Sequence, residues 1–516
     1  MSLKPYLAAS VMALVATGAI AQDDLPQASS EWFTAGQEAI QAIIDRQMNT
    51  NPATNIILMV ADGNGVGTNY ATRLFIGQEE GGMGEDHVLP YETPEWSSAL
   101  VKTYNINAQT PDSAPTAGSM NTGVKQRFNL INLGEEARYD DCSTVEGNEL
   151  TTLAEILEPM GKSVGIISTA RLTHATPAAV YAKTASRNWE DSVPEGCTAQ
   201  ADIATQLIDA MESGLIDFAM GGGHRHFIPE SEEGGRRADG VNLVERATGL
   251  GAQFATNTEE FQALTLDGET PTLALFEPSH MQYEHDRTDE PSLAEMTAAA
   301  IEYLSQNEEG YFLEVEAGRV DHASHAGNLF RTLTDGRAFA EAVAMADEMT
   351  NDEDTLIIVT ADHEHSLAFN GYCGRGSNIL GLCYDIDNSG VAHSDELVLG
   401  DDGLPYPIVG FLNGPGSILV PEAEGEGTQQ VETEVGAAEG TVPTFSGSRP
   451  DVTQEEALDP DYLQQALIPK SSESHSGEDV AVYAKGPWAH LFDGTIEQNV
   501  IFHVMHHAAV TAAAEQ

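Results

Sequence analysis

Carboxylate and imidazole side chains directly follow two apolar segments of the sequence. The segment TLIIVTADHEHS, residues 355–366, carries four polar side chains in succession: Asp362, His363, Glu364 and His365. The segment NIILMVADGNG, residues 55–65, contains another apolar run, which is followed by Asp62. Short apolar runs rich in β-branched residues are typical of strands buried on both faces. The two segments therefore predict that buried strands deliver metal-binding groups to their tips.

Five further short segments contain carboxylate, imidazole, hydroxyl or guanidinium side chains that could take part in chemistry. They are Asp112 and Ser113 in TPDSAPTAG, His174 and Thr176 in RLTHATPAA, Arg187 in SRNW, Glu316, Asp321, His322 and His325 in VEAGRVDHASHAGN, and His475 in SSESHSGEDV. Asp321 and His325 lie on one face if a helix begins there. A lone Asp after a strand is usually a cap, and a lone His is usually a hydrogen-bonded polar residue. As a set, imidazole with carboxylate suits zinc, and carboxylate with hydroxyl suits magnesium.

Strand and helix candidates alternate along the chain and could position these residues. Apolar runs predict strands at residues 55–62, 163–169, 218–222, 310–316 and 355–362. Helical spacing marks EWFTAGQEAIQAIIDRQ, LTTLAEILEPMG, ADIATQLIDAMESG, SLAEMTAAAIEYLSQN, LTDGRAFAEAVAMADEMT and TIEQNVIFHVMHHAAVTAAA. The alternation predicts the α/β class, with a large, mostly parallel central sheet and helices on both faces. Polar residues at the carboxyl ends of its strands would converge on one site.

We expect a single α/β domain over residues 22–516, after a signal peptide over residues 1–21. Lys4, an apolar run and the sequence Ala19-Ile20-Ala21 are typical of a secretory signal. The apolar run falls short of the ~20 residues that a membrane span needs. These features favour an exported protein, periplasmic or secreted. Residues 371–470 are rich in Gly, Pro and acid, and we interpret them as a long insertion in the domain.

The charge balance is strongly acidic. There are 81 acidic and 23 basic residues, which give a formal net charge of −58. Nucleic acid and anionic membrane surfaces are therefore poor partners for the molecule as a whole. The 41% hydrophobic content argues against disorder. We favour a salt-adapted exported protein, because salt screens the repulsion of an acidic surface, over one that is merely acidic.

The four cysteines suit an oxidising compartment. The local pairings are Cys142 with Cys197 and Cys373 with Cys383. Export would permit both disulfides. Zinc ligation is the alternative, and no Cys-x-x-Cys spacing supports it.

The motifs, taken in order, resemble those of alkaline phosphatases. The matching series is ADGNGVG, TPDSAPTAG, TARLTHATPAAVYA, SRNW, VEAGRVDHASHAGN, TADHEHS and ESHSGEDV. The resemblance extends from about Asn55 to the C-terminal helix and leaves only the insertion poorly matched. It implies hydrolysis of phosphate monoesters through a phosphoserine, with two zinc ions and a nearby magnesium ion. Inorganic phosphate and small phosphate monoesters are the implied ligands.

The resemblance also implies a role for each candidate residue. Asp321, His325 and His475 would hold the first zinc; Asp62, Asp362 and His363 the second, with Ser113 beside it as nucleophile; Asp62, Thr176 and Glu316 the magnesium; Arg187 the phosphate; and Asp112, His174 and His322 would lie close to these groups. The chemistry agrees with these residue types, because two metals can activate a weak nucleophile and stabilise a leaving oxygen. Arginine also offers a bidentate fork that lysine lacks.

Two metal assignments stay open. His174 and His322 stand where other members carry Asp and Lys or Trp, and His at both positions is similar to the mammalian subgroup. This difference leaves the identity of the third metal open. Residues 273–292 resemble the mammalian calcium-site region around Phe276 and Glu277, with Glu290 in place of an aspartate. The resemblance therefore also leaves a calcium ion open.

Relatives of this kind are commonly homodimers, and the insertion is placed to form a crown or a dimer-contacting loop. A sulfatase is the nearest alternative enzyme, but Ala117 stands where the sulfatase motif has arginine. A phosphodiesterase or phosphomutase relative would differ mainly in its nucleophile and its pocket for a second ester. A non-catalytic, acidic, exported metal- or phosphate-binding protein is the remaining class.

Overall fold

The structure is a computed structural model that describes residues 25–421, 428–430, 441–443 and 445–514. Its contacts divide the chain into Met1–Gln47 and Met48–Gln516. The first unit contains α1 (Glu31–Asp45), which the apolar spacing of this segment predicted. The signal peptide predicted for residues 1–21 lies outside the described residues. In the described ranges, no helix combines the length and apolar character needed to cross a membrane.

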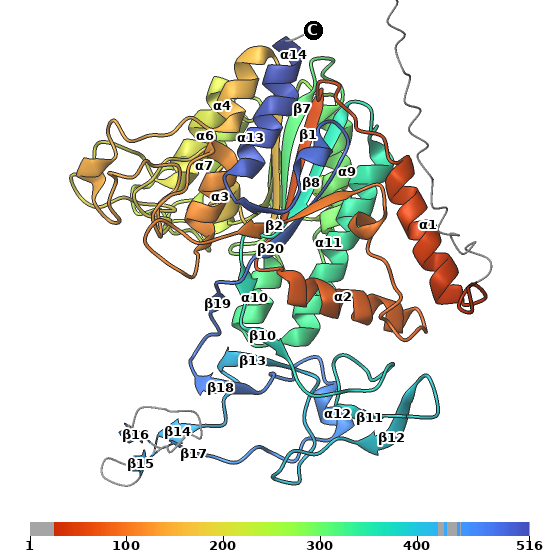
Figure 1. Cartoon of the computed structure of the whole chain (residues 1–516). Coiled ribbons are helices and arrows are strands. Elements are labelled where there is room, and N and C mark those ends of the chain that lie inside the picture. The colour runs from red at the N-terminus through yellow and green to blue at the C-terminus, as the bar shows by residue number, and fades with distance from the viewer. Residues whose placement is uncertain (1–24, 422–427, 431–440, 444, 515–516) are drawn as a thin grey trace, which may run out of the picture. The chain divides into compact units, whose positions relative to one another are not determined.

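A ten-stranded sheet forms the centre of the second unit (Figure 1). Its strands are, in spatial order, β21 (Thr495–Glu497), β2 (Ser97–Lys102), β20 (Val480–Lys485), β8 (Thr355–Thr360), β1 (Asn55–Ala61), β7 (Tyr311–Ala317), β3 (Ser163–Arg171), β4 (Phe218–Gly222), β6 (Thr272–Leu275) and β5 (Gln253–Ala255). Only β20 runs antiparallel to its neighbours, and the other pairs are parallel. The predicted α/β class with a large, mostly parallel sheet is confirmed.

Both faces of this sheet are covered. Along β1, Ile56 and Leu58 pack in one apolar cluster, whereas Ile57 and Met59 pack in another. Successive side chains of a strand point to opposite faces, so the two clusters lie on the two sides of the sheet. Helices α3, α4, α6, α7 and α13 contribute to the first cluster, and α9 and α11 to the second. Burial on both faces explains why β1 and β8 read as continuous apolar runs.

The second unit contains helices from α2 to α14. They are α2 (Val66–Glu79), α3 (Ser113–Thr122), α4 (Leu153–Leu157), α5 (Ala175–Ala178), α6 (Ile203–Ser213), α7 (Leu243–Gly249), α8 (Thr258–Gln262), α9 (Leu293–Leu304), α10 (Arg319–His325), α11 (Leu329–Met349), α12 (Gln454–Ala457), α13 (Val500–His506) and α14 (Ala512–Ala514). One prediction is wrong in detail. Residues 495–497 pair with β2 as strand β21, so the last helix begins only at Val500. The β-branched Thr495 and Ile496 suit a strand, and pairing with β2 satisfies their backbone.

The central strands end at one level, and this sets the position of the polar residues. Val60 of β1 pairs with Thr360 of β8 on one side and with Glu316 of β7 on the other. Asp62 and Asp362 follow these strands directly, so both lie at the same edge of the sheet. Helix α10 and strand β19 (His475–Ser476) lie close to this edge (Figure 1).

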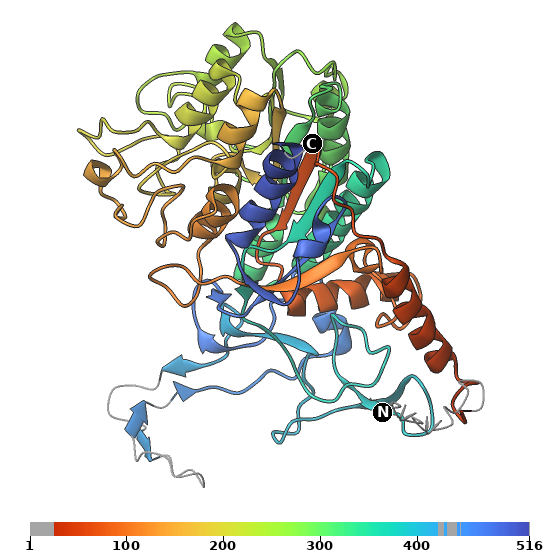
Figure 2. The same ribbon diagram turned by 45° about the horizontal axis from the view of Figure 1, so that its top comes forward.

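Strands of the insertion and the strand just before it form a small sheet, called here the insertion sheet. Strands β10 (Leu367–Phe369), β13 (Val409–Gly414) and β18 (Ala466–Pro469) form three neighbouring strands, and β11 (Tyr384–Ile386) pairs with β12 (His393–Leu397). Shorter pairs join β14 (Val420–Pro421) to β17 (Phe445–Ser446), β15 (Thr428–Gln430) to β16 (Thr441–Pro443), and β9 (Glu364–His365) to β19. Figure 2 shows the strands of residues 371–470, in light blue, outside the ten-stranded sheet. An apolar cluster containing Leu74, Phe75 and Leu333 with Ile379 and Val409 joins the insertion to α2 and α11.

Candidate active site

Ser113 is the first residue of α3, and that helix is buried along its whole length. Asp112 precedes it in extended backbone, with φ −122° and ψ 146°. The helix N-terminus carries a partial positive charge and free backbone N–H groups, which favour an anion near Ser113. The Ser113 Oγ atom lies 3.1 Å from Nε2 of His363. The predicted nucleophile therefore lies in contact with the imidazole that follows β8.

A first ligand group consists of Asp321, His325 and His475. Oδ1 of Asp321 lies 3.2 Å from Nε2 of His325 and 3.3 Å from Nε2 of His475, and the two nitrogens are 3.1 Å apart. Asp321 and His325 come from α10 at the predicted four-residue spacing. Nδ1 of His325 faces the carbonyl oxygen of Glu473 at 2.6 Å, and Nδ1 of His475 faces that of Pro111 at 2.9 Å. These bonds leave both Nε2 atoms for a metal.

A second ligand group consists of Asp62, Asp362 and His363, all fully buried. Nε2 of His363 lies 3.3 Å from Oδ1 of Asp62 and 3.2 Å from Oδ2 of Asp362. Backbone N–H groups of Gly63 and His363 donate to Oδ1 of Asp362. In contrast, neither carboxylate oxygen of Asp62 has a hydrogen-bond partner among the described residues. A buried carboxylate without a donor points to a cation as its partner.

A third group surrounds Glu316 on β7. Its ligand atoms lie close to those of Asp62 and His174. Ser168 donates a hydrogen bond to Glu316 Oε2, whereas within the described part of the chain Oε1 of Glu316 and Oγ1 of Thr176 have no hydrogen-bond partner. The predicted magnesium ligands Asp62, Thr176 and Glu316 are all fully buried. A carboxylate and hydroxyl set of this kind fits a hard divalent cation.

The electrostatics of these groups also fit bound metal. Burial, with the neighbouring Asp362, raises the pKa of Asp62 well above its usual value. Burial likewise raises the pKa of Asp362, and it raises that of Glu316 to about 7. Burial lowers the pKa of His363 well below its usual value, which leaves a neutral imidazole. Divalent cations would neutralise the crowded carboxylates and take the neutral imidazole as a ligand, so the residues fit the metals that the sequence implies.

Arg187 lines the same cavity as Ser113, and its guanidinium contacts two other residues. One guanidinium nitrogen contacts Oδ1 of Asp112, and another lies 3.0 Å from Nε2 of His174. All three residues line a cavity of about 530 Å³ that also contains Ser113 and His475. A guanidinium at the mouth of such a cavity can bind two oxygens of a phosphate group.

The structure places a third imidazole beside His174 and His322. The ring of His280 lies 3.9 Å from that of His322 and 5.3 Å from that of His174, measured between centroids. Burial lowers the pKa of His322 to about 3 and lowers the pKa of His280 as well. Sequence reasoning missed His280, which lies in the segment compared with a calcium site. Its only signal was a histidine in an otherwise acidic stretch.

His365 and Glu364, which follow the second ligand group in the sequence, have separate roles. Nε2 of His365 lies 2.8 Å from Oδ1 of Asp321, and Nδ1 lies 2.5 Å from Oε2 of Glu473. Burial acts to lower the pKa of His365, but these two carboxylates outweigh it and raise the pKa to about 10. The side chain of Glu364 lies beside the start of α2 and accepts a hydrogen bond from Thr68 Oγ1 at 3.4 Å. A Cβ on Gly65 would lie only 1.5 Å from its carboxylate, which explains the glycine.

The residues of the calcium comparison lie around Gln282. The backbone N–H of Gln282 donates to Glu290 Oε1 at 2.7 Å, and its side chain donates to Glu277 Oε1 at 2.9 Å. Phe276 is buried beside them. Burial, with the neighbouring Glu277, raises the pKa of Glu290 to about 7. A calcium ion at this position stays a prediction.

Both predicted disulfides are present, Cys142–Cys197 and Cys373–Cys383. The first packs in a small apolar cluster with Trp189, two residues after Arg187. It therefore supports the loop that carries the guanidinium of Arg187. The second links β11 to the segment that follows β10 within the insertion.

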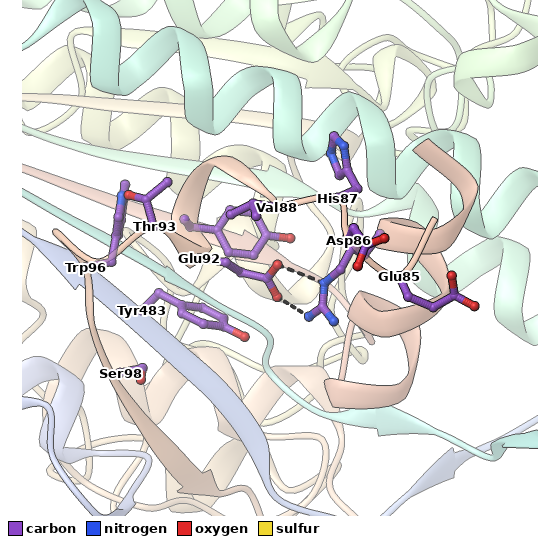
Figure 3. A pocket seen from close by; sticks show the side chains of 11 residues that line it. Glu85, Asp86, His87, Val88, Glu92, Thr93, Trp96, Ser98 and Tyr483 are labelled. Carbon is purple, nitrogen blue, oxygen red and sulfur yellow. Dashed lines mark hydrogen bonds and ion pairs between the residues drawn. The ribbon is translucent and has the colours of Figure 1, made fainter. Parts of the chain in front are cut away.

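A second cavity, of about 450 Å³, lies apart from the ligand groups (Figure 3). Its wall includes Arg73, whose guanidinium bonds both carboxylate oxygens of Glu92. Arg375 pairs with the other two acidic residues of the wall, Glu85 and Asp86. Each acidic side chain that lines this cavity thus has a basic partner, in contrast to Asp62.

Comparisons with known proteins agree with this geometry. Residues 53–511 match the family model described as alkaline phosphatase. The chain is 36% identical over 507 residues to the alkaline phosphatase, tissue-nonspecific isozyme, of Felis catus and of Homo sapiens, covering 93% of this chain and 88% of each relative. The solved alkaline phosphatase of Thermus thermophilus aligns with a TM-score of 0.61 at 22% identity, covering 92% of this chain and 98% of that one. That of the Antarctic bacterium TAB5 aligns with a TM-score of 0.58 at 20% identity, covering 89% and 98%.

Proposed function

The chain belongs to the alkaline phosphatase family and is a metal-dependent phosphomonoester hydrolase, and we propose that it acts through a phosphoserine formed on Ser113. The observation that carries this proposal is the position of Ser113, at the N-terminus of α3 and 3.1 Å from His363. A hydroxyl here meets both the positive end of a helix and a ligand group that follows β8. In the proposed reaction, Ser113 Oγ forms a bond to phosphorus while the ester bond breaks and the leaving alcohol gains a proton.

Water then attacks the phosphoserine, the bond between Oγ and phosphorus breaks, and inorganic phosphate leaves while Ser113 regains its proton. We assign two zinc ions to the first and second ligand groups, and magnesium to Asp62, Thr176 and Glu316. Bound metals supply Lewis-acid activation of the attacking oxygens and stabilisation of the leaving oxygen. The Nδ1 bonds of His325 and His475 to backbone carbonyls support the first assignment, because they aim both Nε2 atoms at Asp321.

Arg187 binds the phosphate in this proposal. Its guanidinium gives up its contact with Asp112 or with His174 and donates two hydrogen bonds to two phosphate oxygens. These bonds hold phosphorus in line with Ser113 Oγ. His174 and His322, as neutral imidazoles, border the same cavity and the magnesium ligands. Their burial supports a positioning role rather than proton transfer.

The decisive test compares three substrates. An aryl phosphate, an aryl sulfate and a bis-aryl phosphate are offered to the purified protein with and without added zinc, and to Ser113→Ala and Ser119→Ala. Ser119 lies on the same helix and donates to the backbone of Pro115, so it is a matched control. We expect zinc-dependent hydrolysis of the aryl phosphate only, lost in Ser113→Ala and kept in Ser119→Ala. Preferred cleavage of the sulfate or the diester would favour a sulfatase or phosphodiesterase.

The protein is further proposed to be exported as a homodimer adapted to high salt. Its N-terminal sequence, its disulfides and its net charge of −58 support export and salt adaptation. The small sheet of the insertion exposes Leu412, Leu467 and Ile468, which supports self-association through this region. Sedimentation of the wild type and of a Leu412→Ser, Ile468→Ser variant tests the dimer. Equal masses at every concentration would exclude this interface.

A further inference from the structure

Glu473 lies just after the insertion, between β18 and β19, and it is linked to the first ligand group in two ways. Its carboxylate oxygen Oε2 lies 2.5 Å from Nδ1 of His365, whose other nitrogen lies 2.8 Å from Asp321. Its backbone carbonyl faces Nδ1 of His325 at 2.6 Å. The backbone N–H of Glu473 also donates to the carbonyl of His325. One residue thus contacts one metal ligand directly and reaches another through a single imidazole ring.

The side chain of Glu473 is itself held firmly. It is 1% exposed, and Oε1 accepts hydrogen bonds from the backbone and hydroxyl of Ser366 at 2.7 and 2.6 Å. Asn413 of β13 donates to the Ser366 hydroxyl, and it accepts from the backbone of Ser474. The position of Glu473 is therefore set by the insertion sheet, which the chain leaves at β18 before it returns to β19 (Figure 1).

We propose that Glu473 is a positioning residue that orients two ligands of the same metal, Asp321 through His365 and His325 through its carbonyl. This inference rests on the proposed function, since it concerns the metal assigned to the first ligand group. With both nitrogens of His365 facing carboxylates, the ring cannot rotate without breaking a buried bond. Asp321 is consequently held at the distance from His325 and His475 that a metal requires. Partners of this kind typically change metal affinity about 10–100-fold when they are altered.

The test uses Glu473→Gln, which keeps the shape of the side chain and removes its charge. Zinc-loaded wild type and variant are mixed with a coloured chelator, and the rate of metal release is followed. His325→Ala, which removes a ligand of the first group, identifies the phase that belongs to this metal. Ser366→Ala is the control, because it breaks a bond of Glu473 that does not lead to the ligands. The melting temperature of each metal-free protein is measured in parallel.

We expect Glu473→Gln to release the first metal about 10–100-fold faster while the second phase stays unchanged. Its metal-free melting temperature should match that of Ser366→Ala. Unchanged release, or faster release matched by an equal loss of metal-free stability, would overturn the positioning role. A wild type that shows no metal phase altered by His325→Ala would instead contradict the metal assignment, so the two failures can be told apart.

An independent observation concerns three histidines of the C-terminal helix. His503, His506 and His507 lie on α13 and at its end, and the backbone N–H of His507 donates to the carbonyl of His503. This is the bond between residues four apart in a regular α-helix, so the two side chains lie on one face. His503 is exposed, and the other two are partly exposed. The ring of Trp488 lies 4.3 Å from that of His507.

We infer that His503 and His507 form an accessible binding site for a transition-metal ion, with His506 beside them. Imidazole pairs prefer borderline metals, and the expected order of affinity is Cu²⁺ above Ni²⁺ and Zn²⁺, with Mn²⁺ weakest. Burial and the two neighbouring histidines lower the pKa of His506, which keeps its ring neutral near pH 7. The site lies on the helix that contacts the C-terminal end of α3: a Cβ on Gly123 would lie 3.2 Å from Cε1 of His503.

Trp488 supplies the probe for this site, because bound Cu²⁺ quenches a nearby indole. Fluorescence of the zinc- and magnesium-loaded protein is titrated with Cu²⁺, then with Ni²⁺ and Mn²⁺ as competitors. Three proteins are compared: wild type, a His503→Ala, His507→Ala variant and Trp488→Phe. We expect saturable quenching in the wild type and at least 10-fold weaker Cu²⁺ binding in the double variant. In Trp488→Phe the saturable quenching should be absent. Equal titrations of wild type and double variant would overturn the inference. A matched His87→Ala, His393→Ala variant should titrate as the wild type does.

Discussion

The carboxylates at the strand ends and those of the insertion belong to the same residue types but behave in opposite ways. Asp62 and Asp362 are fully buried, and burial raises the pKa of each. Asp387 of the insertion is partly exposed, and Asp402 is exposed. Backbone hydrogen bonds from Ser389 lower the pKa of Asp387, and the side chain of Arg449 lowers that of Asp402. The buried carboxylates need a cation to remain ionised, whereas the exposed ones need only water and salt. Burial therefore separates the acids of the second ligand group from those at the surface of this very acidic chain.

The largest expected effect separates these two groups directly. Asp362→Asn should reduce phosphate-ester hydrolysis to background, because the second ligand group loses a charge. In the metal-free protein the same change should raise the melting temperature, since it removes a buried carboxylate that repels Asp62. Asp387→Asn, at a partly exposed site, should change neither quantity. A metal-free Asp362→Asn protein that melts below the wild type would contradict the comparison.

Arg187→Lys should have the next largest effect. A fork to two phosphate oxygens becomes a single point-charge contact, so inhibition by inorganic phosphate should weaken and KM should rise, each about 10-fold. Steady-state kinetics with phosphate as inhibitor measures both. Arg138→Lys, a change at an exposed ion pair with Glu136, serves as the control and should leave both values unchanged. Unchanged phosphate inhibition in Arg187→Lys would mean that Arg187 only supports Asp112.

Asp335 sharpens the comparison through pH. Burial raises its pKa to about 8, although Arg319 opposes the rise. An unfolded aspartate has a pKa of about 3.9. Below that pH the folded and unfolded chains both hold the proton, so Asp335 does not lower the stability of the fold. As the pH rises toward about 8, the unfolded chain loses its proton first and stability is lost. Asp335→Asn should therefore reduce the fall in melting temperature between about pH 5 and about pH 9.

Glu348 is an exposed carboxylate on the same helix, α11, and supplies the control. Glu348→Gln should keep the wild-type dependence on pH. A pH profile shared by Asp335→Asn and the wild type would show that Asp335 is ionised in the folded protein.

Salt should produce the smallest effect, a rise of a few degrees in melting temperature. Between about 0.1 M and about 1 M salt the Debye length falls from ~10 Å to ~3 Å, which screens repulsion among exposed carboxylates. The buried ligand groups are little affected by the same ions. Differential scanning fluorimetry with zinc and magnesium saturating throughout measures the change. A melting temperature that stays flat or falls would refute salt adaptation and leave the site assignment untouched.

The closeness of Asp62 and Asp362 could be predicted from the sequence, because parallel strands end at one edge. Asp62 and Asp362 follow apolar runs whose pairing, Val60 with Thr360, needs no long-range detail beyond the sheet itself. Asp321 and His325 were predicted for a similar reason, since a four-residue spacing fixes one helix face. These cases depend on local periodicity and on one rule of parallel sheets.

Other features depended on contacts that no local pattern encodes. The pairing of His365 with Glu473 requires the insertion to return beside β9, which only the register of β9 with β19 establishes. His280 meets His322 because the segment after β6 folds over β3, where Arg171 donates its backbone N–H to His280. The role of Glu364 depends on its contact with Thr68 of α2, which the sequence did not predict. In each case the partner lies far away in the chain.

Capture of the phosphorylated enzyme tests directly whether a phosphoserine forms on Ser113. The zinc- and magnesium-loaded protein is mixed with an aryl phosphate, quenched in acid and digested, and the peptides are mapped by mass spectrometry. The account predicts a single phosphate on Ser113, absent from Ser113→Ala and present at the wild-type level in Ser119→Ala. Phosphate on any other residue, or continued hydrolysis by Ser113→Ala, would contradict it.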